Sequence, residues 1–331
     1  MIERLSVPSP DTIFGMESTW KPSRLFAAED HGQLYSIVLL NQAISKDHEL
    51  LFETLWRRGE SLKSWQSRHS VVTEKTIFSQ ASLRICADGA ANRLYDTFQA
   101  RGFVQLKQDG NSPHPPHEQG MIPPDEIVGD LDSLKNLVRS YFSSKGTRII
   151  ARPSQYATDL QKSIKRVEEY LQTGGTHRAD DLVIYGGLSG RFDQTAHTLH
   201  VLWQVADGVA NLQGVVDPAD VFQSQAPLKR KRTWVVNDNS LTWLLPPGKH
   251  ILCMSRVVMG KTCGILPLGT GPAGGGAHVT TSGLEWELGA SKLWLSYADK
   301  EQELTEVTYR RWISGLAPWG SPFNVKSLGS G

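Results

Sequence analysis

Cysteine and long hydrophobic runs are scarce in this sequence. Its 331 residues include only Cys86, Cys253 and Cys263, and none of them forms a CxxC pair. A structural zinc site and a disulfide framework are therefore not expected. No apolar run reaches the length of a membrane-spanning helix, and the first twenty residues lack the basic-then-apolar order of a secretory signal. We therefore expect a cytoplasmic protein with no membrane partner.

An excess of charge of one sign is also missing. Lys and Arg together number 35 and Asp and Glu 34, so no net basic field is present that would hold nucleic acid by charge alone. Tryptophan, in contrast, is abundant, with 10 residues, six of which follow residue 230. The C-terminal third is thus rich in flat aromatic surface.

The segment from about residue 34 to 245 alternates short aliphatic runs with longer amphipathic stretches. This alternation is typical of βαβ units on a parallel sheet. Strands are predicted at 34–40, 83–87, 126–128, 148–151 and 182–185, followed by helices that start near residues 48, 90, 133, 158 and 193. The predicted fold class is therefore α/β, with an open, mostly parallel sheet.

After Pro246-Pro247-Gly248 the sequence pattern changes to short strand-like segments separated by Gly and Pro. Candidate strands occupy 251–258, 262–266, 278–281, 292–297 and 303–309, a spacing that favours an all-β sandwich. We predict a flexible arm over 1–30, an α/β catalytic domain over 31–245 and a β-sandwich domain over 246–331. The segments 107–120 and 223–232 are interpreted as solvated loop insertions.

Carboxylates follow the predicted strands of the α/β segment at their carboxyl ends. Ligands bind at this edge of an open α/β sheet because the strand-end loops converge there. Four strand ends each deliver an aspartate: ADGAAN (87–92), VGDLDS (128–133), RPSQYATD (152–159) and GGLSGRFD (186–193). We therefore expect these carboxylates to lie on one rim.

Asp130 and Asp132 flank a single residue, so both carboxylates can point into one cavity. Like charges placed so close are costly unless a cation neutralises them, and hard oxygen ligands suit Mg²⁺. The alternative is that Asp132 and Ser133 only cap the following helix. Taken alone, the Asp-x-Asp pattern favours neither reading; the other rim carboxylates favour the metal.

Thr158 and Asp159 begin a predicted helix, with Lys162 one turn further along. Helix capping is a strong alternative explanation for this pair, because Thr before an acidic first turn is ordinary. From its position, the Lys162 ammonium can reach the rim and contact a phosphate, although an exposed helix lysine is the simpler reading.

The glycine-rich turn Gly186-Gly187-x-x-Gly190 joins a strand to a helix and is followed by Arg191 and Asp193. Backbone amides in such turns approach phosphates closely, although glycines also serve ordinary tight turns. Arg191 adds a bidentate phosphate donor. With no Walker GxxxxGK[ST] motif and no Ser/His/Asp relay, the pattern predicts Mg²⁺-dependent phosphoryl-type transfer in which the substrate supplies the nucleophile.

Seven segments in order resemble the eukaryotic, fungal-like thiamine pyrophosphokinases: ADGAAN (87–92), GDLDS (129–133), QYATDLQK (155–162), GGLSGRFDQ (186–194), LLPPGKH (244–250), CGILPLG (263–269) and TSGLEW (281–286). The resemblance implies transfer of the β,γ-diphosphate of ATP to the thiamine hydroxyl, giving thiamine diphosphate and AMP. It also implies a homodimer whose active sites lie near the subunit interface.

The resemblance also assigns roles to residues. Asp88, Asp130, Asp132 and Asp159 fall on acidic, Mg²⁺-associated positions, and we take the last three as the metal ligands and, with Arg191, as the catalytic set. The candidate nucleotide- and substrate-binding residues of the rim are Asp88, Asn92, Gln155, Lys162, Gly187, Gly190 and Asp193.

Three further residues are implied to contact thiamine. Trp286 is expected to stack on the cationic thiazolium, a contact worth roughly 0.5 to 2 kcal/mol. Ser296 and Asp299 match a Ser-x-x-Asn of the family, with Asp in place of Asn. A carboxylate accepts a hydrogen bond from the aminopyrimidine but cannot donate one.

Two alternatives stay open at this point. A Mg²⁺-dependent nucleotide-sugar glycosyltransferase also uses Asp-x-Asp on an α/β sheet, but it gives no reason for the GGxxGRxD segment. A catalytically silent thiamine-binding protein of the same fold is supported only by Asp299.

Overall fold

The computed structural model describes residues 17–26, 34–56, 80–102, 122–173, 181–206, 232–245, 248–255, 259–260, 262–267, 279–284, 287, 296–297, 304–309 and 313–318. These residues belong to two compact units. Residues 25–238 form one unit, and the described residues before and after this range form the other.

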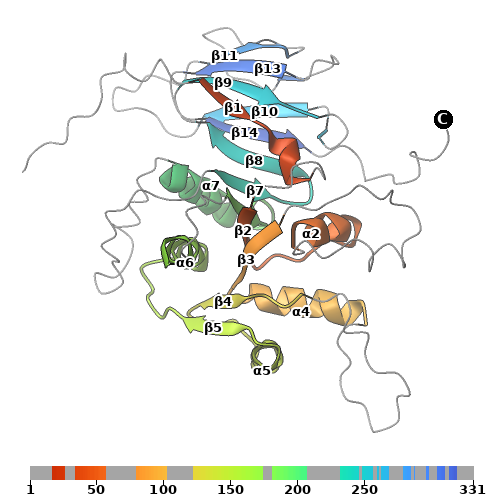
Figure 1. Cartoon of the computed structure of the whole chain (residues 1–331), viewed down its shortest axis with the longest axis vertical. Helices are drawn as coiled ribbons and strands as arrows, with labels where there is room; N and C mark the ends of the chain where they lie inside the picture. The colour runs from red at the N-terminus through yellow and green to blue at the C-terminus, as the bar shows by residue number, and fades with distance from the viewer. Residues whose placement is uncertain are drawn as a thin grey trace, which may run out of the picture. The chain divides into compact units, whose positions relative to one another are not determined.

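A parallel sheet is the centre of the unit formed by 25–238 (Figure 1). Its described strands follow one another in space as β7-β6-β2-β3-β4-β5, and every neighbouring pair is parallel. Their bounds are β2 Leu34–Leu39, β3 Gln80–Ala87, β4 Glu126–Gly129, β5 Arg148–Ala151, β6 Asp181–Tyr185 and β7 Thr233–Val236.

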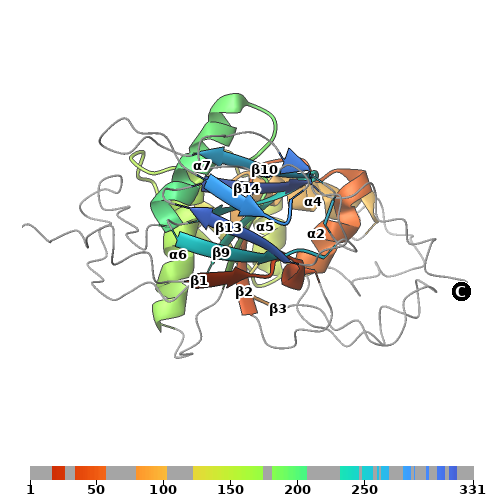
Figure 2. The ribbon, with the colours of Figure 1, turned by 90° about the horizontal axis from the view of Figure 1, so that it is seen from above.

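Helices cover both faces of this sheet. Helices α6 and α7 lie on one face and α2 and α4 on the other (Figures 1 and 2). The bounds are η2 Lys46–His48, α2 Glu49–Trp56, α4 Ala90–Ala100, α5 Asn136–Ser144, α6 Asp159–Thr173 and α7 Phe192–Ala206. Helix α5 packs against α4 through Tyr95 and Tyr141, whose ring centroids are 5.1 Å apart.

None of the described helices combines the length and apolar character needed to cross a membrane.

The core of this unit lies between the sheet and α6. Leu160, Ile164, Val167 and Leu171 recur at helical spacing, and all four are buried against the strands. Strand β6 is buried along its whole length, as expected for a central parallel strand that is covered on both faces. Each large aliphatic side chain buried in this way contributes about 1.5 to 3 kcal/mol.

The strand order reverses at β2. The chain moves outward from β2 through β3 and β4 to β5, and then returns to place β6 on the other side of β2. This reversal is a topological switch point, and its carboxyl end is where open α/β sheets bind ligands.

The other unit is all β, and its described strands pair in the orders β1-β9-β13-β11 and β12-β10-β14-β8. The α/β class with an additional all-β sandwich, predicted from the sequence, is confirmed. The bounds are β1 Glu17–Trp20, β8 Ser240–Leu245, β9 Gly248–Cys253, β10 Thr262–Pro267, β11 Val279–Ser282, β12 Ser296–Tyr297, β13 Leu304–Tyr309 and β14 Ile313–Pro318.

Two boundaries differ from the sequence prediction. Glu17–Trp20, expected to be part of a flexible arm, pairs in parallel with β9, and the Trp20 indole donates a hydrogen bond to Nδ1 of His250 at 3.0 Å. Strand β8 falls within the range predicted for the α/β domain, but residues from 239 onward belong to the all-β unit, where β8 pairs with β14. In both cases the paired strand is distant in sequence.

Smaller differences concern the helix starts. The helix predicted from residue 133 begins at Asn136, since residues 131–134 form the loop that follows β4. Strands β1, β7, β8 and β14 were not predicted. The insertions at 107–120 and 223–232 lie outside the described residues.

Candidate active site

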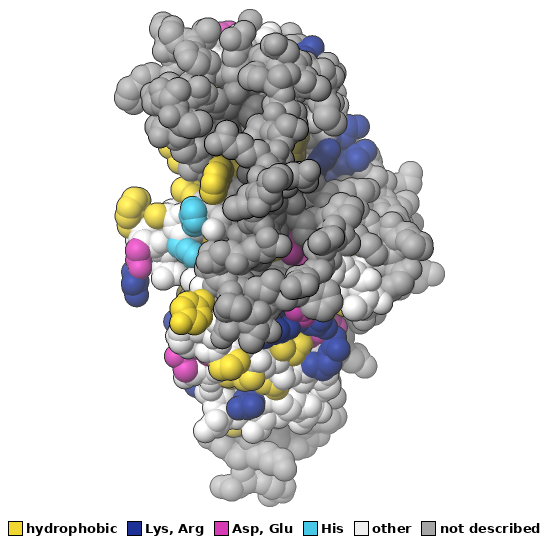
Figure 3. Space-filling view, turned by 90° about the vertical axis from the view of Figure 1, so that its left-hand side faces the viewer, with side chains coloured by type: hydrophobic (Ala, Val, Ile, Leu, Met, Phe, Trp, Pro, Cys, Tyr) yellow, Lys and Arg dark blue, Asp and Glu magenta, His cyan; other side chains and the backbone are white. Residues whose placement is uncertain are grey.

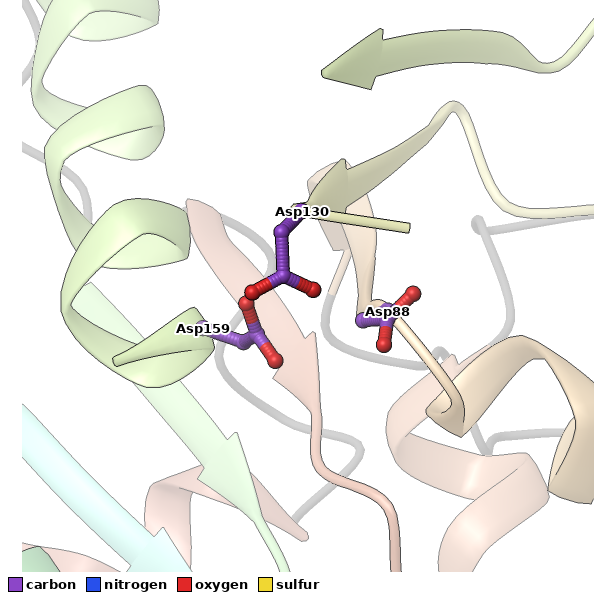
Figure 4. Close-up of side chains that lie close together, drawn as sticks. All are labelled: Asp88, Asp130 and Asp159. Atoms are coloured by element: carbon purple, nitrogen blue, oxygen red, sulfur yellow. The ribbon is translucent and has the colours of Figure 1, made fainter. Parts of the chain in front are cut away.

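Three aspartates meet at the carboxyl end of the parallel sheet. Asp88 follows β3, Asp130 follows β4, and Asp159 is the first residue of α6. Each offers a carboxylate oxygen, and these oxygens all lie within 4.8 Å of one another (Figure 4). The convergence predicted for the strand ends therefore exists for these three side chains.

Asp88 is held in an unusual conformation at the end of β3. Its φ of +43° is in the left-handed region, where a side chain costs energy and which functional sites often use. The backbone N–H donates to the carbonyl of Val128 at 2.9 Å, and Oδ2 accepts from the Ser133 N–H at 3.1 Å. The buried Oδ1 has no hydrogen-bond partner among the described residues, which suits a cation ligand.

The Asp130 carboxylate is surrounded by donors. Oδ1 accepts from the Asp132 N–H at 3.4 Å, and Oδ2 accepts from Nε2 of Gln155 at 3.2 Å and from Nζ of Lys162 at 3.3 Å. Leu131, which follows, has a φ of +68°. The left-handed residue turns the chain, so that the Asp132 N–H comes back to the carboxylate before it.

Lys162 bridges two of the three aspartates. Its side chain is buried, and Nζ lies 3.2 Å from Oδ1 of Asp159 as well as 3.3 Å from Oδ2 of Asp130. The exposed-lysine reading of this residue is therefore wrong. One ammonium partly offsets the repulsion between carboxylates that converge in a low-dielectric site.

Helix capping at the start of α6 is carried out by Thr158. Its N–H donates to Oε1 of Gln161 at 3.0 Å, and its Oγ1 accepts from the Gln161 N–H at 3.4 Å. This reciprocal pair is a capping box. The Asp159 carboxylate is therefore not needed as a cap and is available to the rim.

The three carboxyl groups have different acidities. Burial raises the pKa of Asp88, helped by the negative charge of Asp159. Burial also raises the pKa of Asp159, although Lys162 opposes the shift. At Asp130 burial acts in the same direction, but the Asp132 N–H, Gln155 and Lys162 outweigh it and lower the pKa. The site thus holds one carboxyl group with a lowered pKa and two with raised pKa values.

Asp132 is close to Asp130 in sequence, but its side chain is not part of the trio. Its side chain is exposed, and Oδ1 accepts a hydrogen bond from Oγ of Ser133 at 2.9 Å. Asn92 reaches the same loop from α4, donating from Nδ2 to the Ser133 carbonyl at 2.7 Å and accepting from the Lys135 N–H at 3.1 Å. Its amide is thus occupied in holding the loop.

The glycine-rich turn after β6 has left-handed backbone at Gly186, Gly187 and Gly190, with φ values of +97°, +87° and +84°. The Gly187 N–H, expected to face a phosphate, donates instead to Oε1 of Gln42 at 2.9 Å. Sequence reasoning missed Gln42, although its place just after a buried strand on the same rim was a usable signal.

Arg191 and Asp193 form an exposed pair after this turn. Nε of Arg191 lies 3.0 Å from Oδ1 of Asp193, and Nη2 lies 2.6 Å from Oδ2. The hydrogen bonds raise the pKa of Arg191 and lower that of Asp193, so both stay ionised. The pair presents an oriented guanidinium to solvent, as an anion-binding residue requires.

Aromatic side chains accompany these polar residues. Tyr156 follows Gln155, and Phe192 separates Arg191 from Asp193; both rings are largely exposed. On the side of the molecule seen in Figure 3, exposed hydrophobic side chains are scattered among polar ones, and histidine side chains lie near some of them. Exposed rings beside ion-binding groups can accommodate a ligand that has both an aromatic ring and charged groups.

The residues implied to bind thiamine are mostly outside the described part of the chain. Trp286 and Asp299 lie outside it, and Ser296 is in β12, where it pairs with Cys263 of β10. The structure therefore leaves these three contacts as predictions.

Comparison with known proteins gives matches to two domain families. The family "Thiamin pyrophosphokinase, catalytic domain" matches residues 75–212, and "Thiamin pyrophosphokinase, vitamin B1 binding domain" matches residues 249–296. Thiamine pyrophosphokinase 2 of Oryza sativa subsp. japonica is 30% identical over 221 residues, which cover 66% of this chain and 68% of that protein.

A second plant relative and a solved structure agree with these matches. Thiamine pyrophosphokinase 2 of Arabidopsis thaliana is 29% identical over 272 residues, covering 80% of this chain and 77% of the relative. The crystal structure of yeast thiamin pyrophosphokinase shares the fold, with a TM-score of 0.61 at 18% identity over 93% of this chain and 92% of that one.

Proposed function

Because this chain belongs to the thiamine pyrophosphokinase family, we propose that it transfers the β,γ-diphosphate of ATP to the hydroxyl group of thiamine, releasing thiamine diphosphate and AMP. The observation that carries this proposal is the convergence of three carboxylates and one buried ammonium at the carboxyl end of the sheet. Such a set is suited to a cation and a polyphosphate together.

The carboxylate trio fits Mg²⁺ by its chemistry. All three donors are hard oxygens, and the buried Oδ1 of Asp88 has no partner among the described residues. Asp88, Asp130 and Asp159 would hold the ion, and we retain Asp132 as a candidate outer ligand because it lies on the same loop as Asp130. When bound, Mg²⁺ neutralises charge on the transferred phosphates.

The chain's own residues position the reactants. Lys162 and Arg191 supply positive charge to the polyphosphate, and Gln155, already hydrogen-bonded to Asp130, orients that carboxylate. The thiamine oxygen forms a bond to the β-phosphorus while the bond from that phosphorus to the oxygen bridging to the α-phosphorus breaks. AMP leaves with the bridging oxygen, and the hydroxyl proton passes to a rim carboxylate.

The thiamine contacts, the oligomeric state and the location are also part of the proposal. Trp286 stacks on thiamine, with Ser296 and Asp299 at its polar edge. The chain acts as a homodimer with active sites near the interface, by resemblance to the family. A cytoplasmic location is supported by three cysteines that are all free thiols, as in a reducing compartment. Light scattering and cell fractionation test the last two points.

The central experiment incubates the purified protein with thiamine, ATP and Mg²⁺ and measures AMP and thiamine diphosphate. The two products should appear in equal amounts, and Asp130→Asn should abolish both while far-UV circular dichroism is unchanged. Asp96→Asn, an exposed aspartate of α4, is the matched control and should keep full activity.

Other outcomes would favour the alternatives. Thiamine binding without AMP would indicate a silent thiamine-binding protein. Turnover of a nucleotide sugar in place of ATP would indicate a glycosyltransferase. Wild-type turnover by Asp130→Asn would defeat the site assignment.

A further inference from the structure

Gln42 lies at the switch point of the parallel sheet. It follows β2, whose two neighbours are β3, which leads to Asp88, and β6, which leads to the glycine-rich turn. Residues just beyond a central strand at this point lie where open α/β sheets bind their ligands. The roles assigned so far do not use Gln42.

The Gln42 side chain holds the glycine-rich turn with both ends of its amide. Oε1 accepts the Gly187 N–H at 2.9 Å, and Nε2 donates to Oγ of Ser189. Two hydrogen bonds therefore join the end of β2 to the middle of the turn. A single amide can do this because it carries an acceptor and a donor on one rigid plane.

The turn needs such a fixing group because its own sequence does not determine one conformation. Three of its five residues are glycines with positive φ, the residue type that loses the most conformational freedom on folding. The beginning of the turn is packed, since a Cβ on Gly187 would lie 2.7 Å from both Cδ1 of Leu40 and Oγ1 of Thr198. A Cβ on Gly190 would meet nothing within 4 Å.

The open end of the turn leads directly into Arg191. Other hydrogen bonds hold the earlier part of the turn. The Gly186 N–H donates to the carbonyl of Val236 at 2.7 Å, and Nδ2 of Asn237 donates to the carbonyl of Leu188 at 3.4 Å. Gln42 therefore contributes the contact nearest to Gly190 along the chain, through Ser189. Loss of this contact leaves Gly190 and Arg191 free to take other positions.

We propose that Gln42 is a positioning residue for the nucleotide: by holding Gly187 and Ser189 it fixes the turn in the shape that presents Gly190 and Arg191 to the polyphosphate. The inference rests on the proposed function for its substrate, but the hydrogen bonds that carry it do not. The sequence motif alone suggested that the Gly187 N–H binds a phosphate. In the structure this N–H donates to Gln42 and so holds the turn.

The test uses Gln42→Met, which keeps the length of the side chain but removes both hydrogen bonds. Gln42→Met should lower kcat/KM for ATP about tenfold, as expected for the loss of positioning hydrogen bonds. The KM for thiamine and the Tm should stay at the wild-type values. Gln99→Met, on the exposed side of α4, should change nothing.

Two further measurements separate positioning from general stability. Ser189→Ala should weaken ATP use in the wild type but add little in the Gln42→Met background, because the shared hydrogen bond is already absent. Amide hydrogen exchange of the peptide over residues 186–191 should become faster in Gln42→Met, while exchange in β6 is unchanged.

The outcomes are decisive either way. A lowered Tm with equal losses for both substrates would make Gln42 merely structural and overturn the proposal. Unchanged ATP kinetics and unchanged exchange would overturn it as well. If the wild type forms no thiamine diphosphate, the proposed function fails independently of the role of Gln42. Calorimetric titration with ATP then still tests that role. Weaker ATP binding by Gln42→Met but not by Gln99→Met supports it, and equal binding by both variants defeats it.

Discussion

The backbone of Gly129 passes so close to Asp88 that a Cβ on the glycine would lie 2.7 Å from Cβ of the aspartate. The same Cβ would lie 3.0 Å from Oδ1 of Asp159. A Cβ–Cβ separation of 2.7 Å is essentially never found between real side chains, so any side chain at position 129 would force Asp88 or the nearby backbone to shift. The carboxylates of Asp88 and Asp159 can therefore converge because position 129 carries no side chain.

Gly129→Ala should accordingly push two of the three carboxylates apart. We expect a loss of about 1 to 3 kcal/mol in the free energy of unfolding from overpacking, together with loss of Mg²⁺ binding and product formation. Chemical denaturation and isothermal calorimetry measure the two effects. Gly146→Ala, where a Cβ meets nothing but φ is +89°, should cost stability and keep Mg²⁺ affinity. Normal Mg²⁺ affinity in Gly129→Ala would contradict the geometry.

The sequence-based metal set and the structural trio make different predictions for Asp88 and Asp132. Asp88→Asn removes an oxygen that converges with those of Asp130 and Asp159, whereas Asp132→Asn alters an exposed side chain. We expect Asp88→Asn to weaken Mg²⁺ binding about tenfold or more and Asp132→Asn to weaken it less. Titration with Mn²⁺ followed by electron paramagnetic resonance ranks the two variants, and the reverse order would restore Asp132 to the inner set.

Lys162→Met should leave Asp130 and Asp159 without the ammonium that now lies between them. We expect the metal-free protein to lose about 1 to 2 kcal/mol, less than for a fully buried pair because both carboxylates keep contact with water. Mg²⁺ should raise the Tm of this variant more than that of the wild type, since the ion replaces the missing charge. Product formation should fall about a hundredfold or more. An equal Mg²⁺ effect on both proteins would argue against this balance of charge.

The acidities of the trio predict how Mg²⁺ binding depends on pH. Burial raises the pKa of Asp88 and Asp159, so the folded metal-free protein holds these protons more tightly than the unfolded chain. Their protonation therefore stabilises the folded state at low pH, and this contribution is lost as the pH rises through the folded pKa values. Mg²⁺ requires the ionised forms, so its affinity should fall as the pH drops through the same range, beginning above the ordinary aspartate value of 3.8.

Calorimetric titrations with Mg²⁺ from about pH 8 down to about pH 4.5 measure this dependence directly. The pKa of Asp130 is lowered, so its carboxylate stays ionised and should not contribute in this range. Asp88→Asn should flatten the curve by removing one of the two carboxyl groups whose pKa is raised. A flat curve in the wild type would contradict the raised pKa values.

Arg191→Ala should separate catalysis from stability. Within the described part of the chain the Arg191 guanidinium pairs with Asp193, and both side chains are exposed, so the Tm should not change. Loss of a cation that stabilises charge developing on the phosphates should lower kcat about a hundredfold or more. Arg139→Ala, an exposed arginine of α5, is the control and should be silent in both measurements. Normal turnover by Arg191→Ala would remove this residue from the site.

Much of the site was visible in the sequence because strand ends and glycine turns are local signals. The aliphatic runs that became β3 and β4 placed Asp88 and Asp130 on one edge of a sheet, and the helical period of α6 placed Asp159 and Lys162 one turn apart. These placements follow from the periods of regular structure, two residues in a strand and 3.6 residues in a helix. They can be read from the sequence without knowing which distant segments are in contact.

What the sequence determined by itself is the fold class, the resemblance to a family and the identity of the residues on the rim. Only the tertiary structure decided that Asp88 rather than Asp132 completes the trio, that Lys162 is buried between Asp130 and Asp159, and that Gln42 takes the Gly187 N–H. The same holds for β1 and β8, whose partners are far away in the chain. The physical reason is that periodicity fixes which edge or face a residue occupies, whereas its partners depend on loop conformation and packing between segments distant in sequence.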